Sequence, residues 1–280
     1  MQQRNSVIQA GAERAQISSR SNPAIKTIRG LAIRKQREQT GLFFVDGLHL
    51  VGAAAQQQAA IETCVVAPDL LSSSFGHDLV QTLAQRGAQV ISVTADVFRS
   101  LATKEHAQGI GVVARQRWLE LARSRPEARQ CWVALDTVHY PGNLGTILRT
   151  CDAVGAAGVI LLGNTTDPYD PAAVRASLGA IFSQRLARAS FAEFAEWRQR
   201  HRLAVVGTSP SAALDYQSVA YQAPLVLLMG SEPRGLSREQ QALCDLVVNI
   251  PMVGSSDSLN LAVATGIMLY EIFNQQRGAR

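Results

Sequence analysis

Three loops of this 280-residue chain combine glycines with polar side chains of the kinds that bind small molecules. The first, Asp136-Thr-Val-His-Tyr-Pro-Gly-Asn143, leads into a helical pattern that carries Arg149. The planar guanidinium of an arginine can grip a phosphate or a carboxylate through paired hydrogen bonds. Asn143 lies near the expected start of that helix, where an asparagine also serves as a cap. A purely structural role therefore stays open for Asn143.

The second loop, Gly230-Ser-Glu-Pro-Arg-Gly-Leu-Ser237, follows directly on an apolar run. Its glycines allow the backbone to approach a ligand closely, and Glu232 stands just beyond the end of the expected buried strand. Ser237 has the residue type of a cap for the next helix. The loop is therefore a candidate for both ligand binding and helix initiation.

The third loop, Ile250-Pro-Met-Val-Gly-Ser-Ser-Asp-Ser258, opens an apolar helix expected at about residues 258–273. The N–H groups at such a helix start, together with the Ser258 hydroxyl, are free to bind polar groups. Capping alone would explain Ser258, but it does not explain Asn260 inside so apolar a helix.

The elements that must position these loops follow from apolar periodicity. Strand-like runs alternate with helical segments beyond residue 130, which predicts a parallel α/β sheet covered on both faces. Ligands bind such sheets beyond the carboxyl ends of the strands, where all three loops lie. The remaining pattern predicts a flexible N-terminus (1–20), a small α/β domain (21–115), a linker (116–130) and the parallel-sheet domain (131–280).

Charge is concentrated near the N-terminus. The chain carries 27 Lys and Arg against 22 Asp and Glu, a net charge of +5, and residues 1–40 alone contribute eight basic and two acidic side chains. That segment sums to +6 and the rest of the chain to −1, which indicates a polyanionic partner. A solvated helix face is the open alternative. The candidate phosphate contacts are Lys26, Arg29, Arg34, Lys35 and Arg37.

Composition and missing motifs exclude several classes. With 47% apolar and 18% charged residues, the chain is neither disordered nor of low complexity. It contains no apolar run long enough to cross a bilayer and no signal-peptide pattern at its start, so we expect a cytoplasmic protein. Neither a Gly-x-Gly-x-x-Gly fingerprint nor a phosphate-binding loop is present, which argues against a nicotinamide-dependent oxidoreductase.

Cysteine and histidine spacing gives no support to a metal site. The cysteines stand far apart and form no Cys-x-x-Cys pair, and the five histidines form no ligand pattern. We therefore expect buried, reduced thiols at Cys64, Cys131, Cys151 and Cys244.

Taken in order, the blocks Pro141-Gly-Asn-Leu-Gly-Thr-Ile-Leu-Arg149, Gly230-Ser-Glu-Pro-Arg-Gly-Leu-Ser237 and Ile250-Pro-Met…Ser258-Leu-Asn260 closely resemble the SpoU/TrmH class of the SPOUT superfamily. The segments Asn22-Pro23…Lys26, Phe43-Phe-Val-Asp-Gly47 and His106-Ala-Gln-Gly-Ile110 resemble the small RNA-binding domain that precedes the catalytic domain in many members. The resemblance implies a C-terminal parallel sheet with a trefoil knot, and a homodimer formed through the C-terminal domain.

The resemblance also implies the chemistry. S-adenosylmethionine would contact Leu228, Gly230, Ile250, Met252, Ser258 and Leu259, and the catalytic set would be Arg149, Asn143, Glu232, Ser258 and Asn260. The chain departs from many relatives at Ser231, Pro233 and Asp46, of which Pro233 removes a backbone donor. These departures bear on the geometry of the cofactor loop rather than on the chemistry.

The implied reaction transfers a methyl group to a ribose 2′-hydroxyl, with 23S ribosomal RNA expected as the substrate. Alternatives are the same chemistry on transfer RNA, and an RNA-binding or assembly factor without turnover. A guanidinium is a poor base because its pKa exceeds about 12, so we expect Arg149 to clamp a phosphate and stabilise the developing alkoxide.

Overall fold

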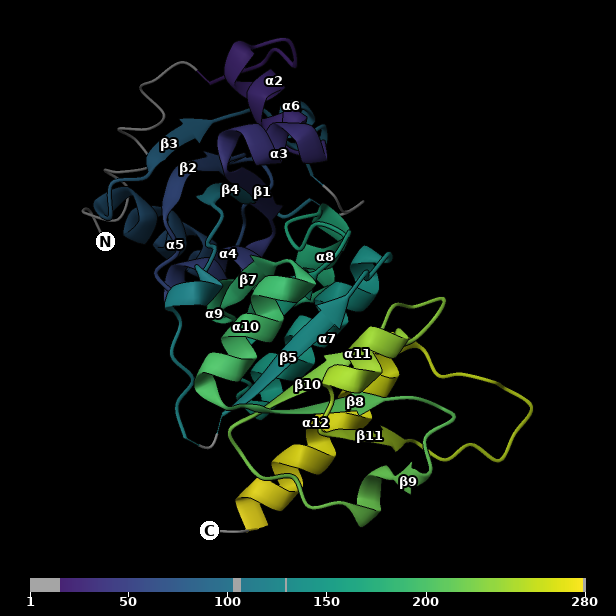
Figure 1. Cartoon of the computed structure of the whole chain (residues 1–280). Helices are drawn as coiled ribbons and strands as arrows, with labels where there is room; N and C mark the ends of the chain where they lie inside the picture. The colour runs from purple at the N-terminus through teal and green to yellow at the C-terminus, as the bar shows by residue number, and fades with distance from the viewer. Residues whose placement is uncertain (1–15, 103–106, 129, 279–280) are drawn as a thin grey trace. The chain divides into compact units, whose positions relative to one another are not determined.

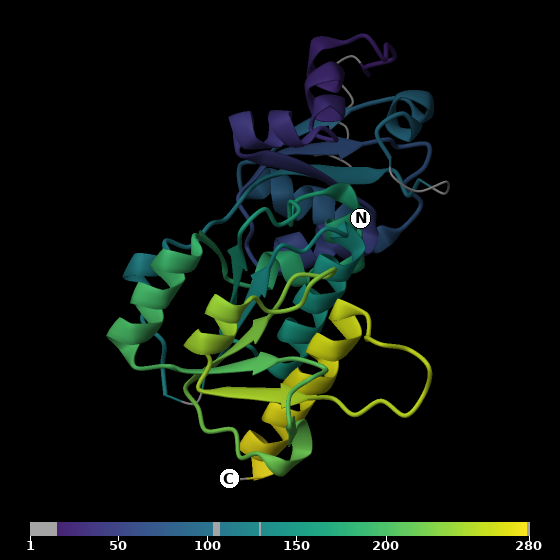
Figure 2. The same ribbon diagram turned by 45° about the vertical axis from the view of Figure 1, so that its right-hand side comes forward.

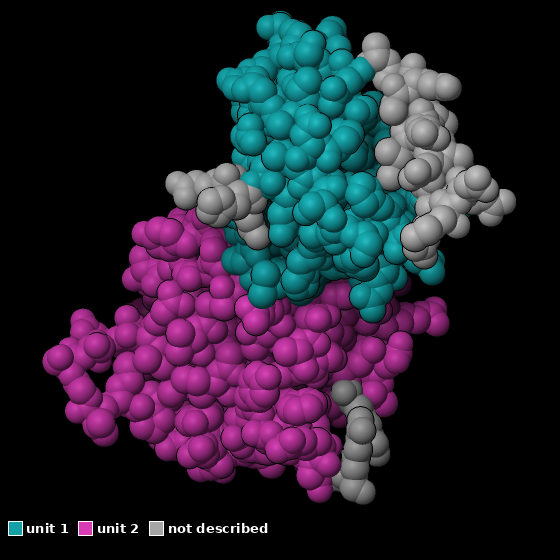
Figure 3. All heavy atoms as spheres, turned by 180° about the vertical axis from the view of Figure 1, so that it is seen from behind, with its two compact units in different colours: residues 1–116, 169–182 teal, residues 117–168, 183–280 magenta. Residues whose placement is uncertain are grey.

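The computed structural model describes residues 16–102, 107–128 and 130–278. Its chain forms two compact units, of which unit 1 comprises residues 1–116 and 169–182, and unit 2 comprises residues 117–168 and 183–280 (Figure 3). No helix among the described residues is both long enough and apolar enough to span a membrane.

Unit 1 is built on a four-stranded sheet in the order β1-β4-β2-β3 (Figure 1). Its strands are β1 (Leu42–Asp46), β2 (Ile61–Val66), β3 (Gln89–Ser92) and β4 (Ile110–Arg115), and its main helices are α2 (Pro23–Gly30), α3 (Arg34–Thr40), α4 (Leu48–Gln56), α5 (Ser74–Gln85) and α6 (Ala95–Arg99). Strand β4 is antiparallel to both β1 and β2, whereas β3 is parallel to β2. The small α/β architecture expected for this region is present.

The basic N-terminal region forms two helices, α2 and α3. The Asn22 side chain accepts a hydrogen bond from the N–H of Ala24 and caps α2, which buries Ile25 and Ile28. Helix α3 ends at Thr40 and is capped by Gly41, whose φ of 67° is available mainly to glycine. Of the segment predicted to be flexible, residues 1–15 lie outside the described residues, and Ile17 pairs with Val93 beyond the end of β3.

The segment Tyr169–Phe182 belongs to unit 1, although it lies between strands of unit 2 in the sequence. It contains α8 (Pro171–Ala176) and the start of α9 (Ala180–Ser183). The rings of Tyr169 and Phe182 pack on Phe43 of β1, with centroid distances of 4.7 and 5.8 Å. Aromatic packing therefore holds this segment in unit 1. The division expected from the sequence, with a linker at residues 116–130, placed the segment in the parallel-sheet domain.

Unit 2 contains a seven-stranded sheet in the order β7-β6-β5-β10-β8-β11-β9, in which every neighbouring pair is parallel. The strands are β5 (Cys131–Asp136), β6 (Gly158–Leu162), β7 (Leu186–Ala189), β8 (Ala204–Thr208), β9 (Leu214–Asp215), β10 (Leu225–Met229) and β11 (Leu246–Asn249). Strands β6 and β10 are buried along their whole length, as is typical of a parallel sheet covered on both faces. The predicted parallel α/β fold is confirmed.

Helices cover the two faces of this sheet (Figure 2). On one face, α10 (Phe191–His201) packs Phe194 and Trp197 against alternate residues of β5, including Trp132. Helices α7 (Pro141–Val154) and α12 (Leu261–Gly278) pack against each other on the other face, and the short α11 (Arg238–Leu243) follows the loop after β10. The first turns of α7 and α12 therefore stand beside the carboxyl edge of the sheet.

Candidate active site

A cavity of about 690 Å³ lies at the carboxyl edge of the unit 2 sheet. Its walls come from the loops after β8, β10 and β11 and from the first turns of α7 and α12. The lining residues from the expected loops include Asn143, Gly230, Glu232, Ile250, Met252, Ser258, Leu259 and Asn260. Ligands of α/β proteins bind at this edge, and cavities of small-molecule sites span about 300–1,000 Å³.

A chain of hydrogen bonds joins the three loops. The Asn143 amide donates to the Glu232 carboxylate at 2.6 Å, and the Asn260 amide donates to the Asn143 carbonyl oxygen at 3.1 Å. Each of these residues belongs to a different loop, separated from the others by 28 to 117 positions. The network therefore fixes the relative positions of the three cavity walls.

Glu232 also holds the start of α7. Its Oε2 atom accepts hydrogen bonds from the N–H groups of His139 at 2.9 Å and Tyr140 at 3.3 Å. These donors stand just before the helix, where N–H groups lack partners within the helix and a negative charge is favourable. With its carboxylate engaged by three donors, Glu232 positions its neighbours.

The loop after β10 is a tight turn. The N–H of Gly235 donates to Ser231 O at 2.8 Å, and the N–H of Ser231 donates to Gly235 O at 3.1 Å. A Cβ atom on Gly230 would lie 2.1 Å from the carbonyl carbon of Gly235, so only glycine fits there. The described hydrogen bonds of the turn are donated by residues 231, 234 and 235, so Pro233 costs the turn none of them.

Asn260 caps α12 rather than lying inside it. Its side-chain oxygen accepts hydrogen bonds from the N–H groups of Ala262 at 2.9 Å and Val263 at 3.4 Å. The expected helix start at about residue 258 was therefore too early, since α12 begins at Leu261 and Ser258 is exposed before it. Capping and the bond to Asn143 together explain a polar residue at the edge of an apolar helix.

Most sequence-predicted ligand-binding residues line the cavity, and one does not. Leu228 is fully buried in the core beneath α10, and its neighbour Met229 lines the cavity instead. Successive residues of a strand point to opposite faces, so a shift of one position separates a core residue from a ligand-binding one.

Arg149 lies on α7 but does not line the cavity of its own chain. Its side chain is exposed and has no hydrogen-bond or ion-pair partner among the described residues. Asn143, six positions earlier, does line the cavity. Since an α-helix turns by about 100° per residue, six positions rotate a side chain to about 120° from its starting direction. The two residues therefore face different ways.

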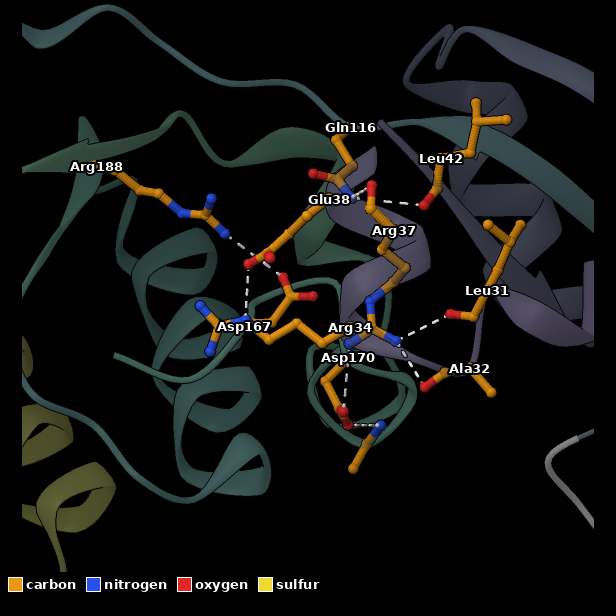
Figure 4. A network of polar contacts seen from close by, with 11 residues as sticks. Leu31, Ala32, Arg34, Arg37, Glu38, Leu42, Gln116, Asp167, Asp170 and Arg188 are labelled. Atoms are coloured by element: carbon orange, nitrogen blue, oxygen red, sulfur yellow. Dashed lines mark hydrogen bonds and ion pairs between the residues drawn. The ribbon is translucent and has the colours of Figure 1, made fainter. Parts of the chain in front are cut away.

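The predicted phosphate contacts of unit 1 divide into exposed and buried groups. Lys26, Arg29, Arg34 and Lys35 are exposed, and Arg29 donates to Ser100 Oγ at 2.8 Å. Arg37 is only 1% exposed; its guanidinium donates to the carbonyl oxygens of Leu31 and Ala32 and lies 3.6 Å from the Asp170 carboxylate (Figure 4). Including Arg37 among the surface contacts was therefore wrong, because it links elements of unit 1.

The sequence-based prediction missed a fourth wall of the cavity. The last residue of β8, Thr208, and the three residues after it, Ser209, Pro210 and Ser211, line the cavity. Tyr140, Arg234 and Gln241 also line it. The signal was present, because Gly207-Thr-Ser-Pro-Ser211 is a polar turn directly after an apolar strand.

The residues present suit an organic ligand with apolar and polar parts. Leu236, Ile250 and Met252 offer apolar surface, and the loops around Gly230 and Gly235 expose backbone groups. Among the described residues, no three His, Cys, Asp or Glu side chains are grouped so that they could hold a metal ion.

These features define a class of protein in which a parallel α/β unit has a ligand-sized cavity at the carboxyl edge of its sheet and a second α/β unit exposes several basic side chains. Residues 130–270 match the model of the SpoU rRNA methylase family, and residues 22–111 match that of the MRM3-like substrate binding domain. The chain belongs to the SpoU rRNA methylase family.

Individual relatives agree over nearly the whole chain. An AdoMet-bound rRNA methyltransferase from Sinorhizobium meliloti is 38% identical, with a TM-score of 0.85 over 92% of this chain and 97% of that one. The SpoU methyltransferase AviRb from Streptomyces viridochromogenes, in complex with AdoMet, is 30% identical, with a TM-score of 0.85 over 92% and 100%. A 23S rRNA (uridine(2479)-2′-O)-methyltransferase from the same organism is 32% identical over 89% of this chain and 88% of its own.

Proposed function

We propose that the protein methylates a ribose 2′-hydroxyl of 23S ribosomal RNA with S-adenosylmethionine as the methyl donor. The observation that carries this proposal is the hydrogen-bonded chain Glu232–Asn143–Asn260, which ties together three loops around one cavity. The names of similar proteins support the substrate class, since they specify 2′-O-methylation of 23S rRNA at uridine or guanosine.

The cavity between the loops after β10 and β11 would hold the cofactor. Gly230, Ile250, Met252 and Leu259 surround it with backbone groups and apolar side chains, and Ser258 offers a hydroxyl at the same wall. Met229 takes the place first assigned to Leu228. The bound cofactor supplies a methyl group already activated by its sulfonium, so the protein chiefly aligns the attacking oxygen.

The chain's own residues then orient the ribose and handle its proton. Asn143 is held by Glu232 on one side and by Asn260 on the other, so its position at the cavity wall is fixed. Ser258 stands exposed at the same wall and hydrogen-bonds the substrate or the cofactor. A nearby guanidinium stabilises the negative charge that develops on the ribose 2′-oxygen.

That guanidinium is Arg149 of a second copy of the chain. Arg149 is exposed on α7 and does not line its own cavity. Next to α7, helix α12 exposes Val263 (52%) and Tyr270 (47%), which are large apolar side chains without cover. A homodimer through these two helices covers the apolar side chains and carries Arg149 to the partner's cavity.

Unit 1 binds the RNA through four exposed cationic side chains, which are Lys26, Arg29, Arg34 and Lys35. Such contacts fix the position of folded RNA through its phosphates, while unpaired bases supply sequence specificity. The match of residues 22–111 to a substrate-binding domain supports this division of labour.

The test uses the purified full chain, methyl-labelled S-adenosylmethionine and unmodified transcripts of 23S, 16S and transfer RNA. Label in 23S RNA that resists alkaline hydrolysis as a 2′-O-methyl dinucleotide is the expected result. Label in transfer RNA alone would refute 23S ribosomal RNA as the substrate. Cofactor binding without label in any RNA would refute the proposed methyltransferase activity.

A further inference from the structure

Two charged side chains line the cavity, and they differ in what they touch. The Glu232 carboxylate accepts hydrogen bonds from the Asn143 side chain and from the N–H groups of His139 and Tyr140. Arg234 is exposed, and among the described residues no hydrogen bond or ion pair engages its guanidinium. An unpaired cation at the wall of a ligand cavity is suited to bind an oxyanion.

The backbone that carries Arg234 is fixed. Its N–H donates to Ser231 O at 3.3 Å, inside the turn closed by the mutual hydrogen bonds of Ser231 and Gly235. The turn therefore fixes the point on the cavity wall from which the Arg234 side chain extends.

An aromatic ring stands at the same cavity. Tyr140 lines it and is 67% exposed, so most of this large ring is free of cover from the protein. Its N–H donates to the Glu232 carboxylate at 3.3 Å, which ties the start of α7 to the turn that carries Arg234. Exposed aromatic rings beside cations are typical of surfaces that stack unpaired bases and bind phosphates.

We propose that Tyr140 and Arg234 form a nucleotide subsite at the cavity, in which the Tyr140 ring stacks on an unpaired base and Arg234 binds a phosphate beside the target ribose. This inference rests on the proposed function and assigns substrate recognition to two residues outside the expected catalytic set. The carboxylate of the cofactor is a second oxyanion in reach of the same chemistry, so the experiment separates the two sources.

The experiment measures S-adenosylmethionine Kd by calorimetry, and Kd and kcat/KM for a 23S rRNA transcript at several salt concentrations. The variants of the full chain are R234A, R234K, Y140A and Y140F. R238A is the matched control for charge, because Arg238 is an exposed arginine four positions away that does not line the cavity.

For R234A we expect RNA affinity and kcat/KM to fall about tenfold, and the slope of log Kd against log salt to decrease by about one. R234K should recover part of this loss, and R238A should stay within about twofold of the wild type, like the cofactor Kd of every variant. Y140A should weaken RNA binding about tenfold, whereas Y140F keeps the ring and should retain wild-type affinity.

A weaker cofactor Kd in R234A with unchanged RNA affinity would assign Arg234 to the cofactor carboxylate and overturn the proposal. Equal RNA affinity for R234A, Y140A and the wild type would overturn it as well. Failure of the proposed function has a different signature, since the wild-type chain would then methylate no RNA while the binding measurements still report on both residues.

Discussion

Glu232 links the three loops of the candidate site through hydrogen bonds to its neighbours. Its carboxylate accepts from two backbone N–H groups at the start of α7 and from the Asn143 amide, and Asn143 in turn accepts from Asn260. Four groups from the two other loops therefore depend on one acceptor. Loss of a buried or partly buried acceptor of this kind costs about 1–3 kcal/mol.

Glu232→Gln places an NH₂ group beside at least one of these donors. If that group faces the Asn143 amide, Asn143 must turn and release Asn260. We expect kcat to fall at least tenfold and the free energy of unfolding to fall by about 1–3 kcal/mol. Steady-state kinetics and urea unfolding measure both, with the exposed Glu239→Gln as the control. Wild-type kcat in the Glu232→Gln variant would show that the network does not position the reaction.

Gly230→Ala tests the close packing of the cofactor loop. Its Cβ would lie 2.1 Å from Gly235 C and 2.3 Å from Leu236 N, both backbone atoms, so the turn must move. We expect loss of cofactor binding in calorimetry and a fall of about 2 kcal/mol or more in the free energy of unfolding. Gly254→Ala is the control, because a Cβ there meets no described atom within 4 Å. Cofactor binding by the Gly230→Ala variant at wild-type affinity would contradict the geometry.

The candidate site could be predicted only in part at this scale. Asn143, Glu232 and Asn260 were identified from their loops and their resemblance to a family, and the structure brings them into one network. Sequence could not tell that Arg37 turns inward, because an arginine on a basic helix looks the same whether its partners are water or carbonyl groups. That distinction depends on distant residues such as Asp170.

At the scale of elements, α12 shows why helix ends and helix faces are hard to predict from sequence. The helix is apolar on nearly every side in its sequence pattern, yet it buries Met268, Leu269 and Ile272 and exposes Val263 and Tyr270. Apolar runs identified the central strands, whereas β7 and β9 are edge strands of four and two residues that give no such run. The observed helix starts three positions after the predicted start, because Asn260 is its cap.

The exposed apolar side chains of α12 allow the proposed dimer to be tested. The double variant V263E/Y270R should shift the chain from dimer to monomer in sedimentation, because it places charges in an apolar interface. Methylation should be lost, since Arg149 then reaches no partner cavity. Leu214→Arg, an exposed apolar residue of β9 (44%), is the control and should remain dimeric. A fully active monomer would refute this arrangement.

At the scale of the whole molecule, the thiols report on burial in both units. Burial raises the pKa of Cys64 and of Cys131 to about 12 and that of Cys244 to about 11, and it also raises the pKa of Cys151. Thiolates are the reactive species, so alkylation by iodoacetamide at about pH 8 should be much slower in the native protein than in guanidinium. Rapid native alkylation of Cys64, Cys131 or Cys151, read by mass spectrometry, would contradict the burial.

The same shifts give stability a pH dependence. The unfolded thiols lose protons near pH 9, while the native thiols keep theirs to higher pH. The contribution of these thiols to the free energy of unfolding is therefore complete below about pH 9 and declines as the pH rises from there towards about 12. Urea unfolding at about pH 7.5 and about pH 10 should therefore show lower stability at the higher pH.

Unit 1 should not be stable without Tyr169–Phe182. A fragment of residues 16–116 exposes Phe43, which normally packs on Tyr169 and Phe182, and leaves Arg37 without Asp170. We expect a Tm well below that of the same fragment joined by a flexible linker to residues 169–182, measured by circular dichroism. Equal Tm values for the two fragments would show that residues 169–182 add nothing to the stability of unit 1.

This discontinuity has a consequence for synthesis on the ribosome. The chain must be translated as far as residue 182 before every part of unit 1 exists, and by then β5, α7 and β6 of unit 2 have also been made. Unit 1 can therefore complete its core only after these elements of unit 2 have been made, which is later than a contiguous leading domain of its size would. When residue 182 has been made, β5 and β6 still lack β10 and β7, which are their outer neighbours in the finished sheet.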